Sequence, residues 1–196
     1  MSIEDEIKRI GGFTPVTGNA NLPPSSDDIS AAVKAYGRAL PQDYLNFIEK
    51  HGFSGPTKIV LVSFPKNLPV YSPDESETGI PPNVQTGCGL SYFYGGEPAE
   101  GRHESLGWNV DCYDGRMPEG FLPIADDGFG NQICLGHSQN GVPGIYFWDH
   151  NDEWDAEDYR EDYGTDMPEI MKYQNVFYIA DSLEGLFKRI VLEQCI

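Results

Sequence analysis

The stretch that decides the fold is Leu122-Pro-Ile-Ala-Asp-Asp-Gly-Phe-Gly-Asn-Gln-Ile-Cys-Leu135, in which two apolar runs flank an acidic, glycine-rich centre. Short apolar runs bounded by Gly, Asn and Asp are typical of strands. Asn, Asp and Gly tolerate positive φ, and Asp side chains accept hydrogen bonds from nearby backbone amides. The stretch therefore predicts a strand, a tight turn from Asp126 to Asn131, and a second strand.

Further strands are predicted on both sides of this hairpin. Each candidate is a short run of β-branched or aromatic residues that ends at Gly, Pro, Asn or Asp. The candidates are residues 59–62, 90–94, 144–148 and 175–179. Together with the hairpin they supply enough strands for one sheet.

Helices are predicted near both ends of the chain. Apolar residues spaced three and four apart indicate amphipathic helices near residues 3–10, 27–36 and 41–51. The closing helix has the clearest pattern, because one face collects five apolar side chains behind an N-cap at Asp181: Leu183, Leu186, Phe187, Ile190 and Val191. Helices, then strands, then a helix predict an α+β fold, with helices packed on one mixed, largely antiparallel sheet.

Length and composition fit one domain that spans residues 1–196. A hydrophobic content of 39% is too high for intrinsic disorder, although the charge is large. Residues 64–119 contain many Pro and Gly residues and little periodicity, so we expect a variable excursion there. A second distinct segment, residues 149–169, is rich in acids.

The net charge of -18 restricts the classes of partner. It argues against binding to nucleic acid or to an anionic membrane surface, because both depend on Lys and Arg. It fits a basic protein partner. The acidic N-terminus predicts no signal peptide, and the four cysteines, which form no C-x-x-C pair, fit reduced thiols in a cytoplasm: Cys88, Cys112, Cys134 and Cys195.

Asp126 and Asp127 are the first candidates for catalysis or metal binding. Adjacent acids in an extended chain point to opposite faces, so a role in the turn is the better interpretation. The spacing of Asp149, Asn151 and Glu153 suggests a calcium loop, but Trp154 stands where an EF-hand has Gly. The histidines, His150 included, show no metal-ligand spacing. We therefore predict no enzyme activity, no metal and no cofactor.

The acidic segment is more informative than any catalytic motif. Residues 149–169 contain ten Asp and Glu residues and one Arg, which gives a local charge of -9. The same segment carries Trp154, Tyr159 and Tyr163, and aromatic anchors among like charges suit a protein-binding patch for a basic partner. The alternative is a solvated acidic loop that its own repulsion keeps disordered.

The order of four landmarks points to a family: Leu40-Pro41 to Ile48, Phe121 to Leu135, Val142 to Asp149, and Ala180 to Leu186. This order resembles the SUKH superfamily, specifically its Smi/Knr type, which is named after a fungal cell-wall assembly regulator. The excursion at residues 64–119 and the long acidic segment depart from the family pattern.

The resemblance implies an α+β domain that serves in bacteria as an immunity protein against a toxin, often a nuclease. It implies no shared catalytic site. The partner is then a cognate, basic toxin, and the residues predicted to bind it lie in the turn and the acidic segment: Asp126, Asp127, Trp148, Asp149, Asp152, Glu153, Trp154 and Asp155.

Two alternative functions remain open at this stage. One is a regulatory scaffold inside the cell, as in the fungal relatives. The other is a hydrolase that uses Asp126 or Asp127 together with His150, for which metal content and activity of the pure protein would be diagnostic.

Overall fold

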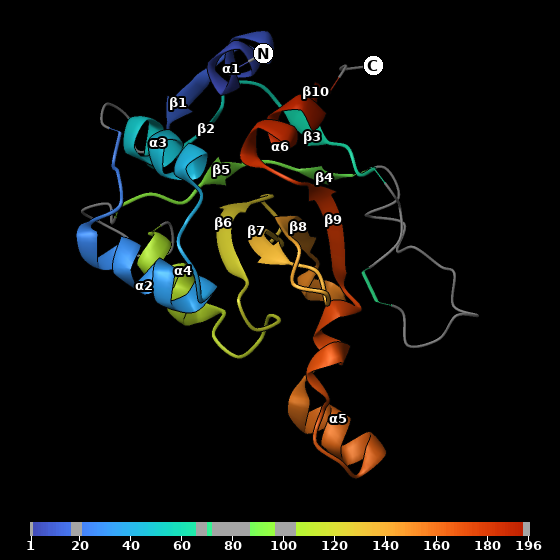
Figure 1. The fold of residues 1–196 in the computed structure, drawn as a ribbon. Coiled ribbons are helices and arrows are strands. Elements are labelled where there is room, and N and C mark those ends of the chain that lie inside the picture. Colours follow the sequence, from blue (N-terminus) through green and yellow to red (C-terminus); the bar gives the residue numbers. More distant parts are fainter. Residues whose placement is uncertain (1, 17–20, 66–69, 72–86, 97–104, 194–196) are drawn as a thin grey trace.

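The computed structural model describes residues 2–16, 21–65, 70–71, 87–96 and 105–193. Figure 1 shows helices gathered around a central sheet, with one helix set apart from the rest. The helices are α1 (Ile3–Arg9), α2 (Ser26–Tyr36), α3 (Gln42–His51), α4 (Leu106–Cys112), α5 (Ala156–Tyr163) and α6 (Leu183–Arg189). None of the helices in this part of the chain combines the length and the apolar character that a bilayer crossing requires.

The strands form two antiparallel sheets. The larger has the order β1-β2-β5-β6-β7-β8-β9, and the smaller has the order β10-β3-β4. Their bounds are β1 (Phe13–Pro15), β2 (Ser54–Pro56), β3 (Val60–Val62), β4 (Cys88–Gly89), β5 (Tyr92–Phe93), β6 (Leu122–Asp126), β7 (Gln132–His137), β8 (Pro143–Trp148), β9 (Val176–Ala180) and β10 (Ile190–Leu192).

The large sheet is buried on both of its faces. Successive side chains of a strand point to opposite faces, and in β8 this alternation places Ile145 and Phe147 in the main core cluster. The residues between and after them, Tyr146 and Trp148, belong to a second cluster on the other face. Strands of this sheet therefore read as continuous apolar runs, where a sheet with one solvated face would show alternation.

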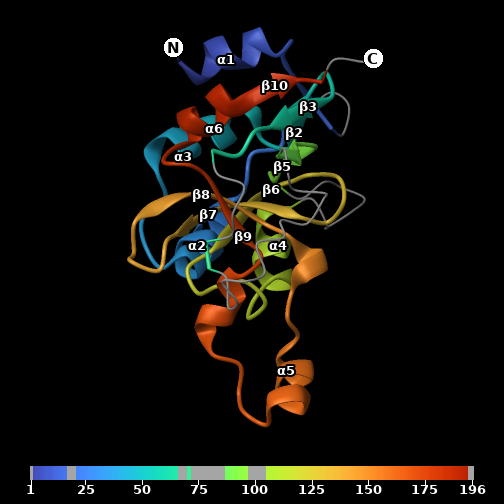
Figure 2. The same cartoon turned by 90° about the vertical axis from the view of Figure 1, so that its right-hand side faces the viewer.

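The main core joins α3 and α6 to the large sheet through a group of phenylalanines. The rings of Phe47 in α3, Phe93 in β5 and Phe187 in α6 lie 4.6 to 5.9 Å apart. Phe13 of β1 completes the group, 5.8 Å from Phe187. In Figures 1 and 2, α1, α3 and α6 lie at one end of the molecule with the small sheet, and α5 projects from the opposite end.

The closing helix differs from its prediction at both ends. Its N-cap is Ser182, whose hydroxyl accepts from the Gly185 amide, while the predicted cap, Asp181, accepts from the Ser182 hydroxyl. The helix ends at Arg189, and Ile190 instead begins β10, which pairs with β3. Ile190 is fully buried in β10. The apolar face of a longer helix would also bury it, so the spacing of apolar residues did not distinguish a helix from a strand here.

The α+β class and the largely antiparallel sheet are confirmed. The structure has two sheets, whereas one was predicted. The strand predicted at residues 59–62 belongs to the small sheet, not to a single large one. The expected excursion at residues 64–119 holds β4, β5 and α4, and parts of it lie outside the described residues. Three predicted thiols are free in the described chain, at Cys88, Cys112 and Cys134, and Cys195 lies outside it.

Leu186→Asp tests the docking of α6 on the sheet. Leu186 is fully buried, so the variant loses an apolar side chain from the core and places a charge there. We expect the free energy of unfolding to fall by about 4 kcal/mol or more, measured by urea denaturation. The control is Val33→Asp on the partly exposed face of α2, which should change stability by about 1 kcal/mol or less. Equal effects of the two variants would contradict the docking of α6.

Candidate functional site

The turn between β6 and β7 is held by the carboxylate of Asp127. Its oxygens accept from the Phe129 amide at 2.8 Å, from the Asn131 amide at 3.1 Å and from the Asn131 side-chain amide at 2.7 Å. Gly128 and Gly130 adopt φ of +91° and +90°, a region that residues with a Cβ rarely occupy. The predicted turn is thus confirmed, and its backbone is rigid.

Asp126 points into the protein as well. Its carboxylate accepts from the Gly128 amide and, at 3.3 Å, from the side-chain amide of Gln132. Burial raises the pKa of this carboxyl above its ordinary range, and the adjacent negative charge of Asp127 raises it further. Both acids of the turn are buried, so neither presents a free carboxylate at the surface.

Gln132 connects the turn to the segment that follows α4. It is fully buried, accepts from the Tyr94 hydroxyl, and donates to the Tyr113 hydroxyl at 2.9 Å and to the Gly130 carbonyl at 3.0 Å. Sequence reasoning missed this role. The available signal was a glutamine inside an apolar strand, because a buried amide requires partners for both of its ends.

His150 is linked to the turn through Asn131. The side-chain oxygen of Asn131 accepts from the His150 backbone amide at 3.1 Å and lies 2.8 Å from Nδ1. Because the Asn131 nitrogen donates to Asp127, its oxygen must accept, so Nδ1 of His150 carries a hydrogen. An amide therefore separates the Asp127 carboxylate from the imidazole, and the direct carboxylate–histidine contact of the alternative hydrolase hypothesis is not formed.

Two of the residues predicted to bind a partner are buried at the end of β8. Trp148 and Asp149 have no exposed surface. The Asp149 carboxylate accepts from the Asn151 amide at 3.0 Å and caps the 3-10 helix His150–Asp152. The Asn175 side chain donates to the Asp149 carbonyl at 2.8 Å. These residues fix the point at which the chain leaves the sheet.

From that point residues 150–168, here called the arm, extend away from the body, as Figure 2 shows. Its helix, α5, has no buried residue, begins at Asp155 as the N-cap and ends at Gly164 with φ of +70°. Acids dominate the helix, and its aromatic side chains pack on one another. Ring centroids of Trp154, Tyr159 and Tyr163 lie 4.5 to 5.7 Å apart. The acidic segment is therefore a short helix with an aromatic cluster of its own.

Both ends of the arm are tied to the segment after α4. Arg116 donates to both carboxylate oxygens of Glu153, at distances of 2.6 to 3.2 Å. The Arg116 guanidinium also lies over the rings of Tyr113, at 5.1 Å, and Trp148, at 5.4 Å. At the other end, the Glu119 amide donates at 2.7 Å to Glu169, the first residue after the arm. Residues 113–119 thus form a clamp, and Glu153 is engaged within the protein.

The other acids predicted to bind a partner lie at the surface of the arm. Asp152 and Asp155 are exposed, Trp154 is half-buried, and Tyr163 beside it is 58% exposed. Burial against its surroundings and the charge of Asp149 raise the pKa of Asp152 above its ordinary range. Asp152, Trp154 and Asp155 are therefore accessible on the arm, whereas the two acids of the turn are buried.

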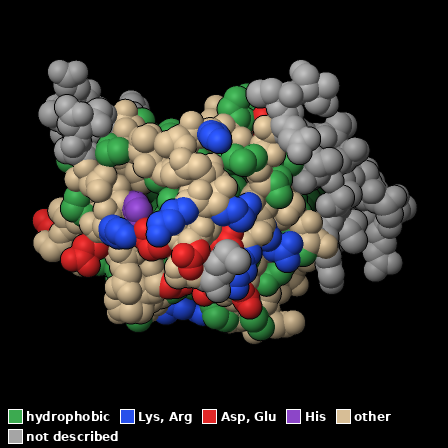
Figure 3. All heavy atoms as spheres, turned by 90° about the horizontal axis from the view of Figure 1, so that it is seen from above, with side chains coloured by type: hydrophobic (Ala, Val, Ile, Leu, Met, Phe, Trp, Pro, Cys, Tyr) green, Lys and Arg blue, Asp and Glu red, His purple; other side chains and the backbone are tan. Residues whose placement is uncertain are grey.

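Charge is distributed unevenly between the two ends of the molecule. Figure 3 looks onto the end opposite the arm, where Lys and Arg side chains alternate with Asp and Glu. Ion pairs there join Arg9 to Glu6 in α1 and Lys188 to Glu184 in α6. Within the described part of the chain, no group of three or more His, Cys, Asp or Glu residues is arranged to hold a metal ion.

A family model matches residues 23–189, which include the hairpin, the arm and the closing helix. The chain belongs to the SMI1/KNR4 family (SUKH-1). One relative is 29% identical over 148 residues, covering 76% of this chain and 72% of its own length: the SPbeta prophage-derived uncharacterized protein YokK of Bacillus subtilis (strain 168). No solved structure matches the chain. The resemblance drawn from the four landmarks is confirmed.

Arg116→Ala tests whether the clamp orders the arm. Without the three hydrogen bonds to Glu153, residues 150–155 at the start of the arm should open more often. We expect amide hydrogen exchange in residues 150–155 to become about tenfold faster, which corresponds to about 1.4 kcal/mol of local stability. Lys188→Ala, which removes an ion pair from α6, is the control and should leave the arm unchanged. Unchanged exchange in Arg116→Ala would contradict the clamp.

Asp126→Asn tests the pH dependence that the buried carboxyl implies. Its raised pKa means that the folded state binds the proton more tightly than the unfolded state does. Wild-type stability should therefore be unaffected by this group at low pH and decrease as pH rises above about 4. The variant lacks this loss, so its stability relative to wild type should improve from about pH 4 to about pH 7 in urea denaturation. A difference that is constant with pH would contradict this assignment.

Proposed function

We propose that this chain is an immunity protein that neutralises a basic toxin of the nuclease class through binding alone.

 The observation that carries the proposal is the arm: an acidic, aromatic surface that extends from the body and is clamped at both ends. Membership of the SMI1/KNR4 family and the likeness to a prophage-derived protein also support it. We place its action in the cytoplasm.

Charge supports a basic partner. The chain has a net charge of -18, and about half of that surplus lies in residues 149–169. A concentrated field of one sign attracts a partner of the opposite sign over a distance of about 10 Å at 0.1 M salt. Carboxylates repeated along a projecting helix offer a nuclease the same sign of charge as the phosphates that its substrate cleft accepts. This is why a nuclease is the proposed class of toxin.

Aromatic side chains of the arm can supply the binding affinity that surface charges alone do not. Surface ion pairs each contribute little to affinity, whereas buried Trp and Tyr side chains are frequent hot spots. In the arm, Trp154 packs against Tyr159 and Tyr163, so its ring is already ordered before a partner arrives. A side chain that is ordered in advance loses less entropy on binding. Trp154, flanked by Asp152 and Asp155, is the proposed centre of the contact.

Binding without catalysis agrees with the geometry of the turn. The Asp127 carboxylate is bonded to backbone and side-chain amides of the turn, and Asp126 is bonded to Gly128 and Gln132. His150 contacts the amide of Asn131 rather than a carboxylate. General acid–base catalysis requires a proton-transfer group within reach of a substrate, and these acids are engaged in holding the hairpin.

The test is the affinity for the purified product of the adjacent gene, taken as the candidate toxin and with any toxic activity abolished by substitution. Trp154→Ala should weaken binding by about 2 kcal/mol or more, roughly thirtyfold. Asp152→Asn with Asp155→Asn removes two charges but keeps an N-cap residue on α5, and it should mainly slow association. Raising the salt concentration should slow association of the wild type steeply and change dissociation less.

The matched control is Asp27→Asn with Glu49→Gln, which removes two exposed acids on the body. It should slow association less than the pair in the arm does. Wild-type affinity in both arm variants, with the fold intact by circular dichroism, would show that the arm is not the interface. Failure of the wild type to bind the toxin would contradict the immunity function itself.

A further inference from the structure

Phe129 is the most exposed large apolar side chain in the described part of the chain, at 79%. It lies at the tip of the turn whose backbone Asp127 holds. An isolated exposed apolar residue is ordinary, but this one has a counterpart. Ile59, which is 69% exposed, is next in the ranking, and both side chains line the same hollow. Two unrelated loops therefore direct their most exposed apolar groups to one place.

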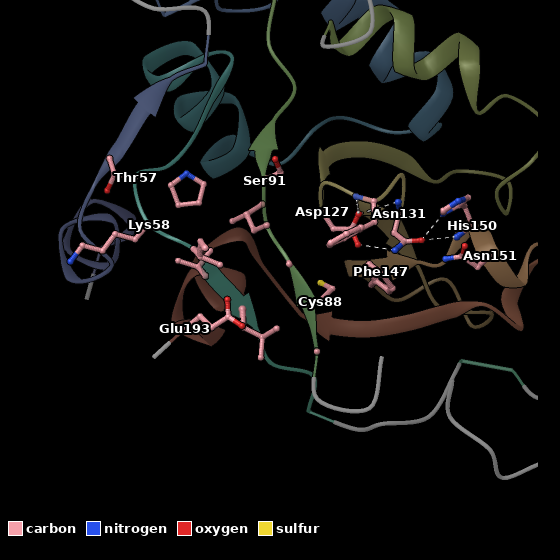
Figure 4. Close-up of a pocket in the computed structure, with 18 residues that line it drawn as sticks. Thr57, Lys58, Cys88, Ser91, Asp127, Asn131, Phe147, His150, Asn151 and Glu193 are labelled. Carbon is pink, nitrogen blue, oxygen red and sulfur yellow. Dashed lines mark hydrogen bonds between the residues drawn. The ribbon is translucent and has the colours of Figure 1, made fainter. Parts of the chain in front are cut away.

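The hollow has a volume of about 980 Å³ and runs between the two sheets. Figure 4 shows Lys58 and Glu193 on one side, Asn131 and His150 on the other, and the chain segment with Cys88 and Ser91 between them. This segment includes Gly89. A Cβ atom at this position would lie only 2.9 Å from the carbonyl oxygen of Asp127. Gly89 therefore allows this segment to pack closely against the turn that carries Phe129.

The hollow continues into the arm. His150 and Asn151, the first residues of the arm, line one end of it. The hydrogen bonds from His150 to Asn131 fix that end to the turn that carries Phe129. The hollow thus reaches the base of the arm, where the chain leaves the body.

The helix of the arm is too small to form a stable interface with a partner protein by itself. A helix of eight residues is about 12 Å long, whereas a stable protein–protein interface buries about 800 Å² on each partner. The contact must therefore extend beyond α5. The hollow adjoins the arm and carries few charges, with Lys58 and Glu193 of opposite sign and the carboxylate of Asp127 engaged in the turn.

We infer that the hollow between Ile59 and Phe129 receives a large apolar side chain of the same toxin that the arm binds. The inference rests on the proposed function and divides the interface into two parts. Acids of the arm attract the basic surface of the toxin, and Phe129 and Ile59 enclose an apolar group that lies next to that surface. An apolar anchor at the centre with charges at the rim is the usual arrangement of a tight interface.

Phe129→Ala and Ile59→Ala test the inference with the same inactivated toxin as the probe. Asp127 bonds to the backbone amide of Phe129, so the alanine variant keeps the turn. We expect the dissociation constant to rise about tenfold or more for Phe129→Ala through faster dissociation, with an unchanged salt dependence of association. The melting temperature should stay within about 2 °C of the wild type, because the lost side chain is exposed.

Val142→Ala is the matched control, since Val142 is 60% exposed in the turn between β7 and β8, directly before β8. It should bind the toxin like the wild type. If Phe129→Ala and Ile59→Ala also bind like the wild type while Trp154→Ala binds weakly, this inference is overturned and the proposed function stands. If the wild type does not bind the toxin, both are overturned.

Discussion

The carboxylate of Asp127 is the interaction on which the arrangement of the site depends. Three hydrogen bonds to Phe129 and Asn131 close the turn between β6 and β7. The same bonds orient the Asn131 amide, whose oxygen then accepts both from the backbone and from the ring of His150. One buried acid thus sets the direction of Phe129 and the position at which the arm begins.

The large sheet makes this arrangement rigid because both of its faces are packed. Trp148 lies on the face opposite α3 and α6, where Arg116 covers its ring and extends to Glu153. The packing of the second face is therefore also the attachment of the arm. A helix as short as α5 has little stability of its own in water, and this attachment supplies the order that its length does not.

The sequence was sufficient to predict the hairpin, the strands at residues 144–148 and 175–179, and the closing helix, because each has a strong apolar pattern within limits set by Gly, Asn or Asp. It did not predict β1, β2, β4 or β10, which have two or three residues each. Strands this short are defined by their partners and not by their own composition. Helix α4 was missed because the chain around it shows little periodicity.

The candidate site could be predicted only in part, for a similar reason. Acid content located the arm, and turn chemistry located Asp126 and Asp127. Whether a carboxylate points outward or inward depends on contacts across the fold, and here both acids of the turn point inward. Trp148 ends the continuous apolar run of β8, so its burial could have been predicted from that run, whereas Asp149 follows the strand and has no such signal. The clamp formed by Arg116 unites residues 37 positions apart and leaves no local signal.

The central claim is that one surface, from the arm to the tip of the turn, meets the toxin. Hydrogen exchange of the chain, measured with and without the inactivated toxin, tests this most directly. The account predicts slower exchange in residues 150–163 and 128–131 in the complex, with α1 and α6 unchanged. Protection confined to α1 and α6, at the end shown in Figure 3, would contradict it.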